Sequence, residues 1–489
     1  MPHVVTQACC GDASCVYACP VNCIHPTPDE PDFGVAEMLY IDPSTCVDCG
    51  ACVSACPVGA IVPGHRLADA AERFVDVNAA HYGIPPEDAV RFPVEKSKRL
   101  PLAPISKPRA IRGGPEVVDV AIVGSGPSAM YAADELLKQP RVRVTVFERL
   151  SQPFGLSRFG VAPDHTATRT VMNLFDEIAR HPNIEIRLGT EVGRDVTLDE
   201  LRSRYTAVLW AGGAPTDKPL AVPGIELAGV QSATSLVGWY NGHPDFLDAG
   251  PDLSTERVVV VGNGNVALDV ARILTGDVDE LAKTDISRDA LAALRSSSVR
   301  EVVVAGRRGP EHAAFTLPEL IGLADGHARV WVDPADLAGT NADDIDDPTV
   351  AAKVSVLREI SERPRPAEPF IRLTFGRTPA EIVGVGRVEG VRFVHTGTDR
   401  SETMDAGVVL TSIGYRGVPV PGLPFDDATG TVANVAGRVV DGDVPVPGVY
   451  VTGWIKRGPS GFIGTNKTDS GETVANLLAD VEARTSVLS

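Results

Sequence analysis

The nine cysteines of this chain all lie between Cys9 and Cys56, so any site that they build is confined to the N-terminal part of the sequence. Four of them follow the spacing Cys-x2-Cys-x2-Cys-x3-Cys-Pro, namely Cys46, Cys49, Cys52 and Cys56. In bacterial iron-sulfur proteins, three thiolates at this spacing hold one cubane cluster, and the fourth ligates a second cluster. A shorter run, Cys15-x3-Cys19-Pro20, precedes it. The sequence therefore predicts two clusters, with Cys19 completing a [4Fe-4S] set and Cys56 joining Cys15.

The second cluster has fewer candidate ligands. Upstream of Cys15 stand only the adjacent Cys9 and Cys10, and two neighbouring side chains rarely point at one small cluster. We therefore expect three thiolates, from Cys15, Cys56 and one of that pair. Three thiolates suit a [3Fe-4S] cluster better than a second [4Fe-4S] cluster. Cys23 is left over.

The segment Cys15-Val-Tyr-Ala-Cys19-Pro-Val-Asn-Cys23, placed ahead of the complete run, resembles seven-iron bacterial ferredoxins. The resemblance implies a small α+β domain in which Cys9 is a ligand and Cys23 is a free thiol near a cluster. The gap between Cys9 and Cys15 is shorter than is usual in that family, so the choice between Cys9 and Cys10 stays open. The implied metal ligands are Cys9, Cys15, Cys19, Cys46, Cys49, Cys52 and Cys56.

Disulfides and zinc are the alternative explanations of the cysteines. Disulfides would imply export, but the start MPHVVTQACC lacks a basic segment followed by an apolar one. Zinc sites favour paired Cys-x2-Cys units spread over a longer span. The pattern thus favours iron-sulfur clusters in a reducing compartment, and we expect a cytoplasmic protein.

Length and charge narrow the class of protein. A chain of 489 residues, 44% of them hydrophobic, has room for about three domains with sizeable cores. No uncharged apolar stretch is long enough for a membrane span. The net charge of -19 argues against a nucleic-acid partner, which requires a concentrated basic patch. Residues 1–66 are especially acidic, with Arg66 as their basic residue.

Residues 67–115 change in character and are rich in proline and basic side chains, among them Lys96, Lys98, Arg99, Lys107, Arg109 and Arg112. Such a composition predicts a semi-rigid connector. Its positive charge suits docking against the acidic residues 1–66, and a solvated linker explains it equally well.

A nucleotide-binding unit begins after the connector. Residues 117–123 form an apolar run that leads into Gly124-Ser-Gly126-Pro-Ser128-Ala129 and a helical pattern. Glycines in this loop let the backbone approach a pyrophosphate at the start of a helix. A second expected strand, 142–147, ends in Glu148, whose carboxylate suits ribose hydroxyls.

The same order of elements returns at residues 257–261, followed by Gly262-Asn263-Gly264-Asn265 and another helical pattern. We expect its second strand at 302–305, beyond an insertion. Arg307 and Arg308 then stand where an acidic residue would bind a ribose 2′-hydroxyl. Paired guanidinium groups instead suit a 2′-phosphate, which favours NADP over NAD, although a solvated turn is the alternative.

Two units with different ribose chemistry imply two nucleotides, FAD in the first and NADPH in the second. The expected fold class is α/β, with two Rossmann-like domains behind the small ferredoxin domain. We place the ferredoxin domain at 1–66, the FAD domain at 116–222 and 405–489, and the NADP domain at 223–404. A late strand near 449 opens into a glycine-rich segment that we expect to close the flavin site, with Trp454 either there or in the core.

From residue 118 onward the chain resembles adrenodoxin reductase, the glutathione-reductase-like class of ferredoxin-NADP reductases. The matching strings are GSGP at 124–127, PFGLSRFGVAPDH at 153–165, VGWYNG at 237–242, GNGNVALDVAR at 262–272, GRRGP at 306–310, AFT at 314–316 and GWIKRGP at 453–459. Together with the cysteine-rich segment, the resemblance covers all but the connector. It points to the fusion of a ferredoxin with a ferredoxin-NADP reductase.

The resemblance also implies site residues. For FAD, with the loop glycines, they are Gly124, Gly126, Ser128, Glu148, Leu156, Val192, Trp454, Gly461, Phe462 and Ile463. For NADP they are Gly262, Asn263, Gly264, Asn265, Arg307, Arg308, Glu319 and Gly461. Glu319 also fits a capping box begun by Thr316. His165 is a candidate polar group near the flavin ring, and a purely structural histidine is the alternative.

The implied activity is that of an NADPH-dependent ferredoxin-NADP(+) reductase. NADPH would give a hydride to FAD, and single electrons would pass to the built-in clusters and then to a ferredoxin, a monooxygenase or another acceptor protein. A disulfide reductase on the same plan needs a cysteine pair beside the flavin, and no cysteine follows Cys56. The remaining alternative is an electron-supplying subunit of a larger complex.

Overall fold

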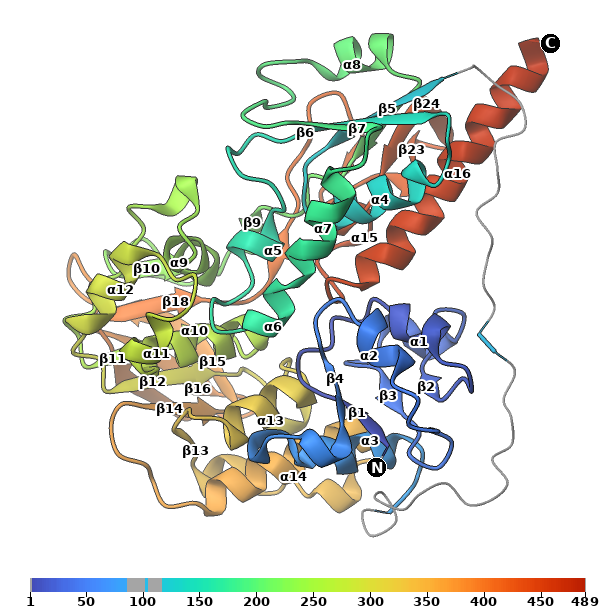
Figure 1. The fold of residues 1–489 in the computed structure, drawn as a ribbon. Coiled ribbons are helices and arrows are strands. Elements are labelled where there is room, and N and C mark those ends of the chain that lie inside the picture. Colours follow the sequence, from blue (N-terminus) through green and yellow to red (C-terminus); the bar gives the residue numbers. More distant parts are fainter. Residues whose placement is uncertain (1, 86–101, 104–116, 489) are drawn as a thin grey trace.

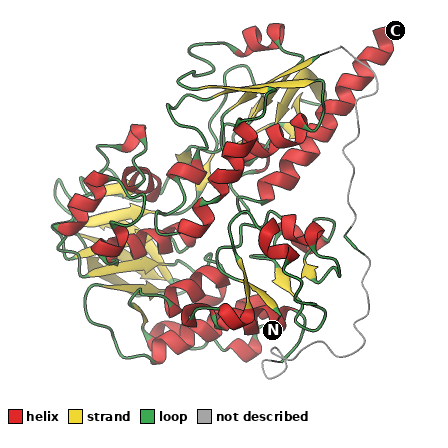
Figure 2. Ribbon diagram, in the orientation of Figure 1, coloured by secondary structure: helices red, strands yellow, loops and turns green. Residues whose placement is uncertain are grey.

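A computed structural model describes residues 2–85, 102–103 and 117–488 of the chain. Three bodies are visible in Figure 1: an N-terminal head in blue and two domains, one with a mixed, mainly parallel sheet and one with a parallel sheet. The head lies in the angle between the other two. Figure 2 shows that helices cover both large sheets, as expected for parallel strands.

The head (residues 2–83) is built from short paired strands, two short helices that contain cysteines, and a third helix, α3 (Arg73–His81). Strand β1 (His3–Val5) pairs antiparallel with β4 (Ile61–Pro63), and β2 (Ile24–His25) pairs with β3 (Tyr40–Ile41). Helices α1 (Ser14–Ala18) and α2 (Ala51–Ala55) pack against each other, and each ends at a cysteine, Cys19 and Cys56 respectively. This small α+β unit is the kind of fold that the cysteine pattern predicts.

Helix α3 (Arg73–His81) belongs to the head, although the sequence places residues 67–115 in the connector. The buried side chain of Asn78 accepts hydrogen bonds from the backbone N–H groups of Val5 (3.2 Å) and Ile41 (2.9 Å). It also donates to the carbonyl of Val5, at 2.9 Å. Because one amide ties β1 to β3, the head continues beyond residue 66. The basic cluster of the connector lies outside the described residues.

The first nucleotide domain (residues 117–215 and 417–488) contains a seven-stranded sheet in the order β22-β23-β24-β8-β5-β6-β7. Its strands are β5 (Val118–Val123), β6 (Val142–Phe147), β7 (Ile184–Arg187), β8 (Ala207–Trp210), β22 (Asn434–Val435), β23 (Arg438–Asp441) and β24 (Val444–Val451). Helix α4 (Pro127–Leu137) packs against the long C-terminal helix α16 (Thr465–Leu488). Strands β5 and β6 lie where the apolar runs predict them.

The second nucleotide domain (residues 218–414) contains a six-stranded parallel sheet in the order β10-β18-β11-β12-β14-β13. Its strands are β10 (Val230–Ser232), β11 (Arg257–Val261), β12 (Glu301–Ala305), β13 (Val330–Val332), β14 (Phe370–Thr374) and β18 (Val408–Thr411). The expected second strand at 302–305 is present as β12. Helices α10 (Asn265–Thr275), α13 (Leu317–Asp325) and α14 (Pro348–Glu362) belong to this domain, as does the antiparallel sheet of β15 (Arg377–Val383), β16 (Gly390–His395) and β17 (Ser401–Asp405).

The chain crosses between the two domains twice, and the crossings run side by side. Strand β9 (Thr216–Asp217) pairs antiparallel with β19 (Tyr415–Arg416). Because β18 is a central strand of the second sheet, residues 405–411 lie in the second domain and not in the first, where the sequence places them. Within the described ranges, no helix combines the length and apolar character needed to cross a bilayer.

The remaining helices and strands connect these layers. They are α5 (Leu156–Phe159), α6 (Thr166–Arg169), α7 (Val171–Ala179), α8 (Leu198–Arg204), α9 (Ala233–Tyr240), α11 (Val278–Leu281), α12 (Arg288–Arg295), α15 (Trp454–Arg457), β20 (Phe425–Asp426) and β21 (Thr431–Val432).

Candidate functional site

Five cysteines of the head line one cavity, which we call the five-cysteine site: Cys19, Cys23, Cys46, Cys49 and Cys52. The sulfur atoms of Cys19 and Cys23 are 3.4 Å apart. A hydrogen bond from the Cys23 thiol lowers the pKa of Cys19 to about 6, and the same thiol lowers the pKa of Cys46 to about 6. Two of the five thiols are thus acidic, whereas burial raises the pKa of Cys52 to about 12. The spacing of the sulfur atoms around one cavity with a mostly apolar lining suits a thiolate-bound cluster.

A second group, which we call the three-cysteine site, consists of Cys9, Cys15 and Cys56. Burial, followed by the proximity of Cys9 and Cys56, raises the pKa of Cys15. Burial also raises the pKa of Cys9 to about 11. The remaining candidate, Cys10, is 4% exposed and packs into the core of the first nucleotide domain with Tyr131. Cys9 packs against the same core, but Cys9 and not Cys10 is among the groups that raise the pKa of Cys15, which favours Cys9 as the ligand of the pair.

Helices α1 and α2 connect the two sites. Helix α1 contains Cys15 of the three-cysteine site and ends at Cys19 of the five-cysteine site. Helix α2 contains Cys52 of the five-cysteine site and ends at Cys56 of the three-cysteine site. The crossed arrangement predicted from the spacing is therefore the one that the helices produce. Backbone N–H groups also point at sulfur, from Cys23 to Cys19 (3.4 Å) and from Ala60 to Cys56 (3.3 Å).

The first glycine loop follows β5. Gly124 has φ +95°, and a methyl group there would lie 2.7 Å from the carbonyl oxygen of Ala211, so only glycine fits. A methyl group at Gly126 would meet no heavy atom of the described residues within 4 Å. This open space lies before the first turn of α4, where a pyrophosphate binds in such folds.

Glu148 stands at the end of β6, beside that loop, and is 6% exposed. Its carboxylate accepts hydrogen bonds from the backbone N–H of Ser125 (3.1 Å), from the Ser125 hydroxyl (2.6 Å) and from the N–H of Leu150 (2.9 Å). These three donors fix the direction of the carboxylate, as a ribose acceptor requires.

The other predicted flavin residues lie on elements around this loop. Ser128 donates to Asn466 at 2.8 Å, so its hydroxyl holds the start of α16. Leu156 is 40% exposed at the start of α5, and Val192 packs partly buried within the first domain. Trp454 begins α15, with its ring 5.2 Å from that of Tyr415. The segment from Gly461 through Phe462 and Ile463 leads into α16.

The second glycine loop follows β11. Gly262 has φ +116°, and a methyl group there would overlap the carbonyl oxygen of Ser412. Among the described residues, no heavy atom would lie within 4 Å of a methyl group at Gly264. Asn263 packs against Gly306, while Asn265 exchanges hydrogen bonds with Thr316 (2.8 and 3.2 Å).

Arg307 and Arg308 are exposed directly after β12. No carboxylate of the described residues forms an ion pair with either guanidinium group, although the chain is strongly acidic. Two adjacent cations without an acidic neighbour repel each other and suit a dianionic phosphate.

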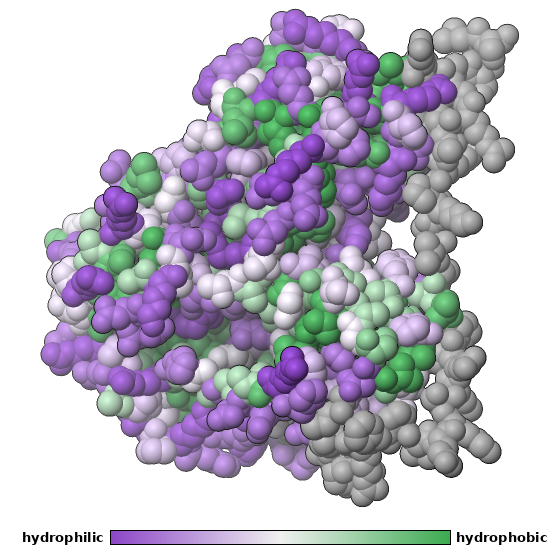
Figure 3. Space-filling model, viewed as in Figure 1, coloured by the Kyte–Doolittle hydropathy of each residue, from purple (hydrophilic) through white to green (hydrophobic). Residues whose placement is uncertain are grey.

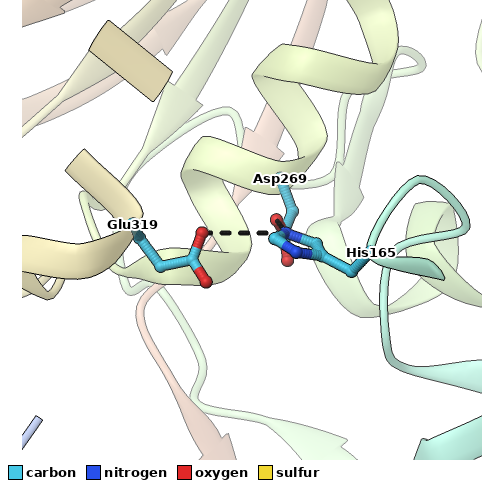
Figure 4. Close-up of side chains that lie close together, drawn as sticks. All are labelled: His165, Asp269 and Glu319. Carbon is cyan, nitrogen blue, oxygen red and sulfur yellow. Dashed lines mark hydrogen bonds and ion pairs between the residues drawn. The ribbon is translucent and has the colours of Figure 1, made fainter. Parts of the chain in front are cut away.

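Glu319 and Asp269 of the second nucleotide domain meet His165 of the first (Figure 4). The His165 Nε2 atom lies 2.9 Å from Asp269 Oδ1 and 3.6 Å from Glu319 Oε2. Burial disfavours the charged ring, but Asp269 and then Glu319 outweigh it and raise the pKa of His165 to about 9. Burial would raise the pKa of Asp269, yet His165 and Arg272 lower it to about 2. The histidine is therefore an imidazolium at neutral pH.

The capping-box explanation of Glu319 does not apply. Thr316 precedes α13 without a side-chain cap, and its hydroxyl instead accepts from Asn265. The Glu319 carboxylate does not cap the helix and accepts a hydrogen bond from the side-chain amide of Gln7 in the head, at 2.9 Å. Burial raises the pKa of Glu319.

Sequence reasoning did not identify Gln7, Asp269 or Arg272 as parts of this site. Arg272 donates to Asp164 (2.6 and 3.0 Å) and to Asp269 (2.8 Å). Asp269 and Arg272 lie one turn apart on α10, directly after the second glycine loop, which was the available signal. Gln7 left no such signal, because its partner is 312 positions away.

The chain matches two protein-family descriptions. Residues 39–62 match a 4Fe-4S binding domain, and residues 118–287 match the pyridine nucleotide-disulphide oxidoreductases. The first match lies in the head, within a span that covers four of its cysteines. The second match contains both glycine loops and the helix α10, which follows the second loop.

Relatives cover the chain almost from end to end. A Mycobacterium tuberculosis protein named "Probable ferredoxin/ferredoxin--NADP reductase" is 55% identical over an alignment 489 positions long, which covers 98% of this chain and 84% of that protein. The human mitochondrial NADPH:adrenodoxin oxidoreductase is 42% identical over 74% of this chain and 79% of its own length. A solved structure of Mycobacterium tuberculosis FprA in complex with NADPH shares 43% identity, with a TM-score of 0.71, over 76% of this chain and 86% of that one.

The cysteine-lined head, the two glycine loops and the relatives agree with one another along the whole sequence. The chain belongs to the ferredoxin/ferredoxin-NADP reductase family, in which a ferredoxin domain precedes a two-domain reductase of the adrenodoxin reductase type.

Proposed function

We propose that this protein oxidises NADPH at a bound FAD and passes single electrons through its own two iron-sulfur sites to an external acceptor protein. The observation that carries the proposal is the docking of the head. Gly464, one residue after the predicted flavin segment 461–463, donates its N–H to the carbonyl oxygen of Cys10 at 2.7 Å. Cys10, the neighbour of the proposed ligand Cys9, thus lies beside the segment that we assign to the flavin.

The residues of both nucleotide domains fit their proposed ligands. The open side of Gly126 and the fixed carboxylate of Glu148 suit the pyrophosphate and ribose of FAD. The open side of Gly264 and the cations of Arg307 and Arg308 suit NADPH. When bound, the two cofactors supply hydride and one-electron chemistry, and the protein supplies their relative position.

His165 and Glu319 would place opposite charges where the nucleotide domains meet. Held by Asp269, the imidazolium of His165 presents a fixed positive charge, and the Glu319 carboxylate has hydrogen-bond capacity beyond Gln7. We assign Glu319 to the nicotinamide end of NADPH and His165 to positioning and charge stabilisation beside the flavin ring.

For the clusters we propose a [4Fe-4S] cluster on Cys19, Cys46, Cys49 and Cys52, and a [3Fe-4S] cluster on Cys9, Cys15 and Cys56. Both sites place their thiols in largely buried surroundings and offer backbone N–H groups to sulfur. Cysteines in this state need a reducing compartment, and we propose the cytoplasm.

Anaerobic stopped-flow mixing with NADPH tests the function. We expect flavin bleaching first, then loss of the broad cluster absorbance, and a much weaker response to NADH. Reduction of an added one-electron acceptor by the purified chain alone is also expected. Flavin reduction without any cluster reduction would refute the internal transfer, and a need for an added subunit would favour an electron-supplying component of a larger complex.

A further inference from the structure

The two cysteine sites lie at different distances from the first nucleotide domain. The loop that follows Cys56 packs into that domain, where Val58 and Ala60 are each 1% exposed within its core. The Thr170 hydroxyl donates to the carbonyl of Pro57 at 3.0 Å. Two segments beside the three-cysteine site, the loop after Cys56 and the residue Cys10, therefore pack against the first domain.

The five-cysteine site lies on the other side of α1 and α2. None of the residues that line its cavity belongs to the core of the first domain, as far as the described ranges extend. At its mouth, Val47, Asp48 and Cys49 are exposed to solvent. This site therefore opens away from the flavin segment and toward the outside.

Three sets of polar contacts fix the head in this orientation. Lys467 of α16 contacts Asp12 at 3.1 Å. The buried Lys353 of α14 contacts Glu37 at 2.9 Å, and Glu37 also accepts the N–H of Leu317 at 2.6 Å. Arg73 of α3 contacts Asp325 (2.8 Å) and Glu359 (2.9 Å). The head thus has polar contacts with both nucleotide domains.

From these positions we infer the direction of the internal route. The three-cysteine site receives electrons from the flavin, and the five-cysteine site hands them to the external acceptor at the surface around Val47 and Cys49. The inference rests on the proposed function and adds an order to it. Each NADPH loses two electrons and becomes NADP+, with one proton released. The electrons leave one at a time and reduce two acceptor molecules.

The geometry of the helices makes this order physically reasonable. Cys15 lies within α1 and Cys19 at its end, four positions later. Four positions correspond to about 6 Å along a helix axis. The two sites are therefore neighbours, and the hydrogen bond from Gly464, the residue after the flavin segment, to Cys10 lies beside the three-cysteine site.

The surface around the five-cysteine site indicates the partner. At the mouth of the site Val47 is 48% exposed and is followed by the exposed carboxylate of Asp48, and the head also exposes Tyr17 (43%), Asp29 and Asp32. Figure 3 shows hydrophobic residues gathered on the visible face of the head. The carboxylates that face the body, Asp12 and Glu37, are neutralised by lysines. An acceptor protein with an apolar contact area and a basic rim fits this surface.

Removing one cluster at a time tests the order. In Cys56→Ala, iron and sulfide analysis should show loss of the three-cysteine cluster, and NADPH should still bleach the flavin but no longer reduce the remaining cluster. In Cys49→Ala, NADPH should still reduce the three-cysteine cluster, and reduction of cytochrome c should be lost. Electron paramagnetic resonance after rapid freezing reports each cluster separately.

The outcomes separate the two claims. If both clusters of the unaltered protein are reduced by NADPH and Cys56→Ala leaves reduction of the other cluster equally fast, the order is wrong while the function stands. If NADPH reduces no cluster in the unaltered protein, the proposed function itself fails. Should Cys56→Ala lose both clusters, Cys9→Ala is the second variant with the same expected result.

A positive charge introduced at Val47, at the mouth of the five-cysteine site, tests the docking surface without removing a cluster. We expect Val47→Lys to raise the KM for cytochrome c, a basic one-electron acceptor, by about fivefold at low ionic strength, with the difference fading in high salt. Flavin and cluster reduction by NADPH should stay unchanged. The matched control is Val444→Lys, at an exposed valine of the first domain, which should leave the KM unaltered. Equal KM values for both variants would overturn the assignment of this surface.

Discussion

The side-chain amide of Gln7 donates a hydrogen bond of 2.9 Å to the carboxylate of Glu319, which joins the ferredoxin head to the second nucleotide domain. The end of the Gln7 side chain lies directly over Gly322, one turn further along α13, where a methyl group would overlap it. His165 lies 3.6 Å from the same carboxylate oxygen. A side chain of the head therefore contacts the Glu319–His165 pair beside the proposed nicotinamide site.

Replacing Gly322 tests this contact. In Gly322→Ala, the methyl group should displace Gln7 and remove its bond to Glu319, a loss of about 1 kcal/mol that offsets the gain of about 1 kcal/mol from alanine in a helix. We expect a free energy of unfolding close to that of the unaltered protein. Gly471 of α16 is the matched control, since a methyl group there meets no described heavy atom within 4 Å. Chemical denaturation should show Gly471→Ala to be the more stable variant. Equal stabilisation by both changes would mean that Gln7 does not pack on Gly322.

The imidazolium of His165 predicts a pH dependence of stability. Its pKa rises from 6.5 to about 9 in the fold, because Asp269 and Glu319 outweigh burial. A group whose folded pKa is raised contributes its full stabilisation below the unfolded pKa and loses it as the pH rises through the folded value. We expect about 3 kcal/mol to be lost between pH 6.5 and pH 9.

Denaturant titrations at pH 6 and pH 9.5 measure this loss. His165→Gln should remove that part of the slope, while His243→Gln, a change at a histidine whose pKa burial lowers, should keep it. An unchanged slope in His165→Gln would show that another group titrates.

The exposed pair of arginines should determine nucleotide preference. Arg307→Ala combined with Arg308→Ala removes both cations proposed for the 2′-phosphate, at a cost of about 1.5 to 3 kcal/mol for charged hydrogen bonds. We expect the KM for NADPH to rise by one to two orders of magnitude, while the KM for NADH, which lacks that phosphate, stays the same. Flavin reduction under anaerobic conditions measures both. Arg400→Ala, at an exposed arginine of the same domain, is the control, and an equal effect on NADPH and NADH would argue against the assignment.

Replacing Cys9 and replacing Cys10 should change the iron content of the protein differently. Cys9→Ala should remove the three-cysteine cluster, because Cys9 lies beside Cys15 and Cys56. Cys10→Ala should keep the cluster and leave a small cavity against Tyr131, with a modest loss of stability. Iron and sulfide analysis with electron paramagnetic resonance of the oxidised protein distinguishes the variants. Retention of the cluster in Cys9→Ala and its loss in Cys10→Ala would reverse the assignment.

Much of the fold was predictable, because local sequence determines it. Strands β5, β6 and β11 coincide with apolar runs that end at a glycine loop or an acidic residue. Strand β12 was predictable from the apolar run before Arg307, despite the insertion that separates it from α10. The spacing of the cysteines also predicts that each helix serves both sites. Helices α1 and α2 are five residues long, so each contains a cysteine of one site and ends at a cysteine of the other.

Contacts between distant segments were not predictable. The buried amide of Asn78 ties α3 to strands more than 30 positions away, and nothing near it in the sequence shows that role. Thr316 and Glu319 have the spacing of a capping box, but the tertiary contacts with Asn265 and Gln7 replace it. Local propensity was outweighed in both places by partners from another part of the chain.

The shared helices α1 and α2 have a consequence for how this protein can change. Each helix supplies a ligand to both proposed clusters, so the spacing between the two metal centres is set by one turn of helix and cannot drift as domains move. A substitution that bends either helix disturbs both centres at once, and adjustment of a single reduction potential must therefore come from the surrounding loops.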